Sequence, residues 1–225
     1  MPAWFLAPYI LFLAAFPMFL IAVYRSGRKK VLLLKMACSL CFILVGALGF
    51  ALGKLQSPPI YDMLMITAFC LSLLGDLALA WKDNQHTFLL GLVAFLIAQV
   101  CFGVTFSFYN HFATLDILVF AVLFIGPILA YLFLHLDVGD LKIPVLVYLL
   151  VIAFMFTKAL SSLYLKGISL PAQWLVAVGA GLFYFSDAIL ALNKFQRQPS
   201  KYLRTINLIT YYAGQMLLAS SLYFF

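Results

Sequence analysis

The chain alternates between long apolar runs and short polar connections. Eight apolar segments can be separated, each of roughly 20 residues, which is the length an α-helix needs to cross a bilayer core. The connections are too short to hold a further domain. The pattern predicts an all-α polytopic membrane bundle with eight transmembrane helices, and one domain over residues 1–225. The expected spans are 3–23, 31–52, 60–81, 87–109, 115–135, 142–163, 171–192 and 203–223.

Composition strengthens the membrane prediction. Of the 225 residues, 66% are hydrophobic and only 9% are charged, and the mean hydropathy is +1.12. A soluble domain of this size does not bury so much apolar surface. The net charge of +7 does not indicate a nucleic-acid partner, because the basic residues lie mostly between the apolar runs and there indicate topology.

The distribution of Lys and Arg predicts the orientation. If the first connection, with Arg25 to Lys30, is cytosolic, only Lys54 and Lys166 lie on the opposite side. Such a bias is typical of the positive-inside rule. Both termini are then expected on the non-cytosolic side of a multi-pass protein of the cell (cytoplasmic) membrane. The basic residues expected on the cytosolic side are Arg25, Arg28, Lys29, Lys30, Lys82, Lys142, Lys194, Arg197, Lys201 and Arg204.

Two aspartates interrupt apolar runs. Asp76 lies in the third expected span and Asp187 in the seventh. An ionised group within the membrane costs about 2.5–3.5 kcal/mol on insertion scales, so function is its default interpretation. Each aspartate follows a small residue near the cytosolic end of its span, and a glutamine, Gln99 or Gln215, lies in the next span. This similarity predicts a parallel internal repeat of four plus four spans.

Further polar groups are expected at a depth similar to that of the two aspartates. Lys35 is about one turn inside its span, and on the eighth span Tyr211 and Gln215 share a face. Two neighbouring carboxylates in a low dielectric do not readily ionise together, so one is a proton donor and the other an anion. This predicts an acid–base site. The candidate substrate-binding residues around Asp76 and Asp187 are Lys35, Tyr148, Ser186, Asn193, Lys194, Tyr211, Tyr212 and Gln215.

A structural interpretation stands beside the catalytic one. Asp76 can form an ion pair with Lys35, the tyrosines can belong to an interfacial belt, and the glutamines can join helices. Asn193 and Lys194 either bind a lipid phosphate or end a helix favourably. The remaining aspartates at span ends, including Asp62 and Asp116, are expected to be solvated.

Several other chemistries are disfavoured. The histidines His86, His111 and His135 are at or near span ends and not on one side, which argues against a histidine–aspartate zinc site. There is no GxSxG elbow, P-loop or dinucleotide fingerprint. The four cysteines lie in apolar runs without convincing metal-ligand spacing. Metal-free acid–base chemistry by aspartates remains for an enzyme.

Several blocks of this sequence resemble the YhhN-like membrane proteins, a family that includes the lysoplasmalogenases. They extend from the second expected span to the eighth, and the blocks around Asp187 and Tyr211 are the most specific. The residues that carry the resemblance are Lys35, Gly75-Asp76 to Trp81, Phe88, Gly91, Gly181-Leu182-Phe183, Ser186-Asp187, Ala191-Leu192-Asn193-Lys194-Phe195, Arg204, Thr210-Tyr211-Tyr212 and Gln215-Met216-Leu217.

The resemblance implies an eight-span hydrolase that cleaves the vinyl ether bond of lysoplasmenyl-ethanolamine or -choline, giving a fatty aldehyde and a glycerophospho base. It implies no metal or organic cofactor, and a lysophospholipid partner in the cytosolic leaflet. Asp76 and Asp187 are expected to divide the acid and anion roles, without an assignment of which is which. The alternatives are a proton- or cation-coupled transporter and a non-catalytic lipid-binding membrane protein.

Overall fold

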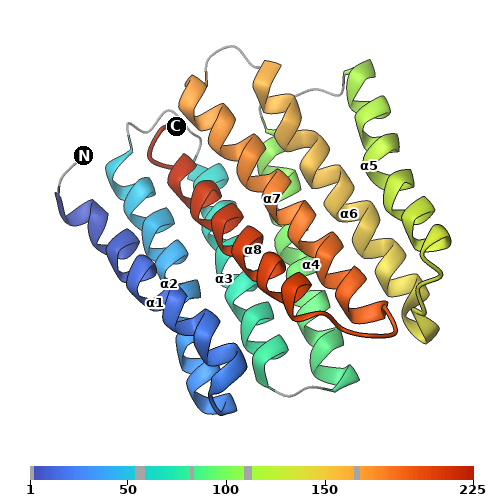
Figure 1. Ribbon diagram of the computed structural model, residues 1–225. Coiled ribbons are helices and arrows are strands. Elements are labelled where there is room, and N and C mark those ends of the chain that lie inside the picture. Colours follow the sequence, from blue (N-terminus) through green and yellow to red (C-terminus); the bar gives the residue numbers. More distant parts are fainter. Residues whose placement is uncertain (1–2, 54–58, 82–83, 109–112, 165–167) are drawn as a thin grey trace. The chain divides into compact units, whose positions relative to one another are not determined.

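The computed structural model describes residues 3–53, 59–81, 84–108, 113–164 and 168–225, and its regular secondary structure over these residues is entirely helical (Figure 1). Four residues that served above to predict the topology and to disfavour a zinc site lie outside these ranges: Lys54, Lys82, Lys166 and His111. The eight α-helices are α1 (Ala7–Arg25), α2 (Arg28–Leu52), α3 (Pro59–Trp81), α4 (Gln85–Ser107), α5 (Thr114–Phe133), α6 (Lys142–Ser161), α7 (Leu170–Phe195) and α8 (Lys201–Ser221).

The predicted helices are confirmed, with α7 continuing past its expected end at residue 192 to Phe195. On length and composition, seven helices among the described residues can cross a membrane, so the chain is a multi-pass integral membrane protein. α8 is less apolar because it carries Lys201, Arg204, Asn207 and Gln215. That α8 also spans the bilayer stays a prediction.

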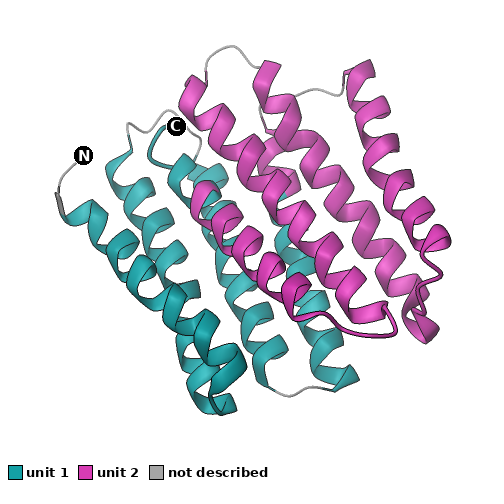
Figure 2. Ribbon diagram, in the orientation of Figure 1, with its two compact units in different colours: residues 1–102, 218–225 teal, residues 103–217 magenta. Residues whose placement is uncertain are grey.

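The chain forms two compact units (Figure 2). Unit 1 contains residues 1–102 and 218–225, and unit 2 contains residues 103–217. The predicted single domain, the internal repeat and the sidedness of the termini stay predictions.

In unit 1, α2 packs against α1 and α3, and glycines bring α3 close to α4. A Cβ atom on Gly75 would lie 2.6 Å from the ring of Phe95, and one on Gly91 would lie 3.3 Å from the carbonyl oxygen of Gly75. Small residues allow the two helices to approach closely. Close van der Waals packing stabilises helix pairs in lipid, where no hydrophobic effect drives them together. Asp76 therefore follows directly on a tight helix–helix contact.

In unit 2, α6 packs against α5 and α7, and α7 closely approaches α8. A Cβ atom on Gly214 would lie 2.8 Å from the carbonyl oxygen of Gly179 and 3.0 Å from the backbone nitrogen of Phe183. The two backbones are nearly in contact at this point, four to eight residues before Asp187 on α7.

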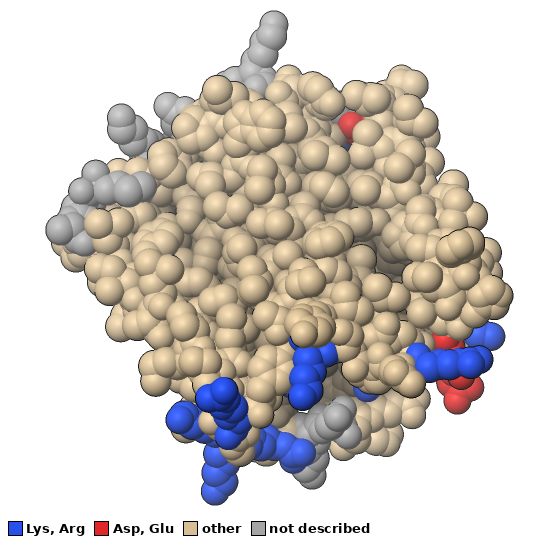
Figure 3. Space-filling model, in the orientation of Figure 1, with Lys and Arg blue, Asp and Glu red and all other residues tan. Residues whose placement is uncertain are grey.

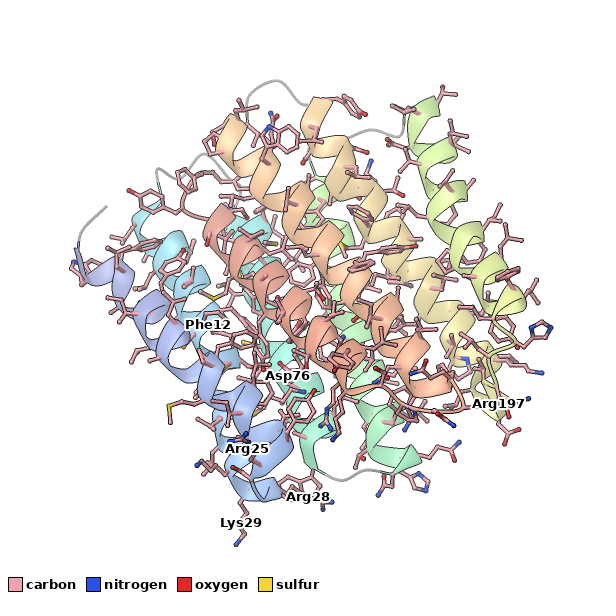
Figure 4. The ribbon with its side chains drawn as sticks, viewed as in Figure 1. Phe12, Arg25, Arg28, Lys29, Asp76 and Arg197 are labelled. Carbon is pink, nitrogen blue, oxygen red and sulfur yellow. The ribbon has the colours of Figure 1, made fainter. Side chains whose placement is uncertain are left out.

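Basic side chains gather at helix ends in each unit. In unit 1, Arg25, Arg28 and Lys29 are exposed where α1 gives way to α2 (Figure 4). In unit 2, Lys142, which begins α6, and Arg197, which follows α7, are also exposed. Away from such clusters the face drawn in Figure 3 is almost free of charged side chains, as expected for a surface in contact with lipid.

Candidate active site

Asp76 is enclosed by polar partners in unit 1. It is 1% exposed, and its Oδ1 atom lies 3.0 Å from the Nζ atom of Lys35 on α2. Ser39, one turn after Lys35, donates a hydrogen bond of 2.6 Å to Oδ2. Figure 4 labels Asp76 on α3. These are the contacts of a carboxylate anion, and they confirm the ion pair with Lys35 that the structural interpretation named.

Asp187 has a different setting in unit 2. It is partly exposed, and its Oδ2 atom accepts a hydrogen bond from the hydroxyl group of Tyr148 on α6. Both residues line one cavity. The sequence placed Tyr148 among the site residues by depth alone, and the structure places its hydroxyl on the Asp187 carboxylate.

The cavity lies among α5, α6 and α7 and has a volume of about 670 Å³. This is within the range of ligand pockets, about 300–1,000 Å³. Leucine, valine, isoleucine, alanine and phenylalanine form most of its wall. Its polar members are Tyr131, Lys142, Tyr148, Tyr184 and Asp187. A mostly apolar wall with a few convergent polar groups is typical of a small-molecule site.

Tyr184, one turn before Asp187, links the cavity wall to α5. Its hydroxyl group donates a hydrogen bond of 2.6 Å to the carbonyl oxygen of Leu123. In an α-helix this carbonyl would accept from the amide of residue 127, which is Pro127 and has no N–H. Tyr184 thus supplies the donor that the proline lacks, and its ring is held in the cavity wall.

Of the predicted substrate-binding residues, Ser186 joins α7 to α8, and Asn193 holds the connection between the two helices. The Asn207 side chain donates to the Ser186 backbone oxygen at 2.8 Å and to the Ser186 hydroxyl oxygen at 3.2 Å. The Asn193 side-chain oxygen accepts hydrogen bonds from the Ser200 amide at 2.7 Å and the Gln196 side chain at 3.0 Å. These bonds favour a structural role for Asn193 and Ser186. Lys194 is exposed.

The other predicted residues on α8 are buried. Tyr211 and Tyr212 are 5% and 0% exposed, and their rings form an edge-to-face pair with centroids 4.8 Å apart. Gln215 is 0% exposed, and neither its side-chain oxygen nor its nitrogen has a hydrogen-bond partner among the described residues. They do not line the cavity around Asp187, and their substrate contact stays a prediction.

The predicted meeting of Asp76 and Asp187 also stays a prediction. The two carboxylates belong to different units. Within its unit, Asp187 is brought together with Tyr148 and Tyr184, and Asp76 with Lys35.

A buried ion pair in unit 2 was not predicted. Asp116 on α5 was expected to be solvated, but this was wrong, because it is 3% exposed. Its Oδ2 atom lies 3.4 Å from the Nζ atom of Lys158 on α6, and its Oδ1 atom accepts a hydrogen bond of 2.7 Å from Ser161. Asp62 is likewise buried, at 2% exposure. A signal existed for Asp116, since it begins one span and Lys158 ends the next, which places both at one depth.

Lys142 was predicted only as a marker of topology, yet it lines the cavity. Its position at the start of a span gave no signal of this. Among the described residues, no group of three or more His, Cys or Asp side chains is placed to hold a metal ion.

The sequence of this chain matches one protein family and several of its relatives. The model of the YhhN family matches residues 31–222. "Lysoplasmalogenase TMEM86A" of Homo sapiens is 33% identical over 196 residues, which are 82% of this chain and 73% of that protein. "Lysoplasmalogenase" of Mycobacterium tuberculosis is 32% identical over 136 residues, 58% of this chain and 49% of that protein. No solved structure matches the chain.

Proposed function

The chain belongs to the YhhN family, and we propose that it is a membrane hydrolase that cleaves the vinyl ether bond of lysoplasmalogens. The observation that carries the proposal is the Asp187 carboxylate, which lies beside Tyr148 on the wall of an otherwise apolar cavity. Relatives that match most of the chain are named lysoplasmalogenases. A cavity of this kind suits a lipid with one hydrocarbon chain and one acid-sensitive bond.

The chemistry requires a positioned acid. Protonation of the vinyl ether at the carbon farther from oxygen gives an oxocarbenium ion. Water adds to the carbon bonded to oxygen and releases one proton, which gives a hemiacetal. Cleavage of the bond between this carbon and the glycerol oxygen then gives the aldehyde and the free glycerol hydroxyl. One water molecule is consumed and the proton is returned, as in the hydrolysis of glycosidic bonds.

We assign the proton donor to Asp187 on grounds of access. Asp187 lines the cavity, whereas Asp76 is 1% exposed and held by Lys35 and Ser39. Tyr148 donates to Oδ2 of Asp187, which favours Oδ1 as the oxygen that carries the reacting proton. The two-carboxylate hypothesis then gives Asp76 the other role, stabilisation of the oxocarbenium ion.

Lys142 is the candidate contact for the lipid phosphate within this cavity. It begins α6, six residues before Tyr148, which corresponds to about 9 Å along the helix axis. The glycerol backbone of a lysolipid separates its phosphate from its ether bond by a comparable length of chain. From the sequence, Asn193 and Lys194 were predicted either to bind a lipid phosphate or to end a helix, and the headgroup and the cytosolic leaflet stay proposals.

The test uses the full chain reconstituted in phosphatidylcholine vesicles that contain lysoplasmenyl-ethanolamine. We expect the protein to release fatty aldehyde and glycerophosphoethanolamine. Asp187→Asn should lower the rate at least about a hundredfold, the smaller contribution expected of a general acid. Asp140→Asn is the matched control, because Asp140 is exposed in the connection before α6. Near-normal turnover by Asp187→Asn would remove Asp187 from the mechanism, and intact lysolipid after long incubation with the unmodified protein would overturn the hydrolase proposal.

A further inference from the structure

The α5 side of the cavity is one helical face. Leu123, Pro127, Ala130 and Leu134 line the cavity, and their spacing of three or four residues places them in one row along the helix. Gly126 lines the cavity beside this row. The row extends over 12 residues, about 17 Å of helix, and it faces the part of α7 that carries Asp187.

In the described structure, polar contacts to neighbouring helices hold the first half of α5. Asp116 binds Lys158 and Ser161 of α6 near the start of α5, and Tyr184 of α7 binds the Leu123 carbonyl near its middle. From this point toward Phe133 the cavity lies between α5 and its neighbours. The side chains of α5 beyond Leu123 therefore set the width of the cavity.

Gly126 leaves room at the middle of this wall. A Cβ atom built on Gly126 meets no atom within 4 Å, unlike Cβ atoms on Gly75 and Gly214. No close helix contact explains the glycine here, although glycine costs about 0.5–1 kcal/mol in a helix relative to alanine. What it provides is open space directly before Pro127, at the height of the hydrogen bond from Tyr184.

We propose that Gly126 is a specificity-determining residue, which leaves room for the hydrocarbon chain of a single-chain ether lipid to pass along α5 beside the hydrogen bond from Tyr184. This inference rests on the proposed function for the identity of the lipid. A chain that moves from the bilayer into this cavity gains little from burial, because lipid is as apolar as the cavity wall. Steric fit therefore decides which chains are accepted, and the side chain at position 126 controls that fit.

The experiment compares two lysoplasmenyl-ethanolamines, one with a decenyl and one with an octadecenyl chain. In Gly126→Leu, kcat/KM for the octadecenyl lipid should fall about 5-fold to 150-fold relative to the decenyl lipid, the range that overpacking a filled site costs. Gly126→Ala should show a smaller shift in the same direction. Leu129→Phe is the control, because Leu129 is 59% exposed on α5 and does not line the cavity. Gly126→Leu is expected to fold, since its side chain enters open space.

A second measurement does not depend on cleavage. An ether-linked lysophosphatidylethanolamine with a diazirine at the end of its saturated chain is photo-crosslinked to the protein, and the labelled peptides are identified. Label on the cavity-lining faces of α5, α6 or α7, reduced in Gly126→Leu, supports the chain path. Label confined to other peptides, or an unchanged chain preference in Gly126→Leu with cleavage intact, overturns it. An equal change in preference in Leu129→Phe also overturns it. Label on the cavity walls without cleavage of any vinyl ether lipid would overturn the proposed function and leave the chain path standing.

Discussion

The hydroxyl group of Tyr184 donates a hydrogen bond to the carbonyl oxygen of Leu123, the one carbonyl that Pro127 leaves without its helical amide donor. A proline within α5 and a tyrosine on α7 are thereby coupled across the cavity wall. In a membrane a backbone carbonyl without a donor is costly, and proline is tolerated where a neighbouring helix supplies one. The pair explains how α5 keeps Pro127 beside the cavity.

This coupling predicts the stability of a pair of variants. Tyr184→Phe should lower the free energy of unfolding by about 1 kcal/mol, because the Leu123 carbonyl loses its donor. In a Pro127→Ala background the amide of residue 127 can bind this carbonyl, so the same tyrosine substitution should cost much less. Unfolding of the four proteins in detergent micelles measures the coupling. Equal losses in the two backgrounds would show that the hydroxyl does not substitute for the missing amide.

The ion pair of Asp76 and Lys35 allows stability and chemistry to be separated. Asp76→Asn leaves the buried Lys35 ammonium without its partner charge, and breaking a buried pair in this way costs about 3–5 kcal/mol. Adding Lys35→Met removes the unpaired charge, so the double variant should regain most of the lost stability. If Asp76 takes part in the reaction, Asp76→Asn should lose aldehyde release, and the double variant should not regain it.

Activity per folded protein decides between the two roles of Asp76. Folded protein is quantified by gel filtration, and aldehyde release is measured on that fraction. A stable double variant with near-normal turnover would leave Asp76 as a structural ion pair only.

The hydrogen bond from Tyr148 to Asp187 predicts a change in kcat. Tyr148→Phe removes the donor that orients the carboxyl group and stabilises the carboxylate formed as the proton leaves. It should lower kcat about 10-fold to 100-fold, the value of a hydrogen bond to a charged group. KM should change little if the hydroxyl acts on Asp187 and not on the lipid. Tyr131→Phe is the matched control, since Tyr131 lines the same cavity on α5. A rise in KM with unchanged kcat would instead place Tyr148 in lipid binding.

The helices were predictable because bilayer thickness fixes the length of each apolar run. The pairing of Asp76 with Lys35 was also within reach, since an intramembrane charge needs a partner at its own depth. The same reasoning from depth placed Tyr148 near Asp187, and the structure shows their hydrogen bond; its contact with substrate stays a prediction. Asp116 was missed because a charge at a span end is normally solvated, and its burial depends on how far α6 covers the start of α5.

The cavity could not be predicted from the sequence. It exists where α5 and its neighbours fail to pack, and apolar residues that line a cavity have the same pattern as those that fill a core. Gly126 and Gly214 show this clearly, because both are glycines within apolar helices. Only the structure shows that a Cβ atom is free of contacts at Gly126 and meets backbone at Gly214.

These two glycines give a final, matched prediction. Gly214→Ala adds a methyl group that would lie 2.8 Å from the Gly179 carbonyl oxygen, so α7 and α8 must separate. Because backbone atoms cannot yield as a flexible side chain can, the change should cost about 1–3 kcal/mol and disturb α7 close to Asp187. Gly126→Ala makes the same chemical change in open space, and it should leave the unfolding free energy equal or slightly higher, as expected for alanine in a helix. Thermal unfolding of the two variants in one detergent provides the comparison. Equal stabilities would show that the contact between α7 and α8 is looser than the described backbones indicate.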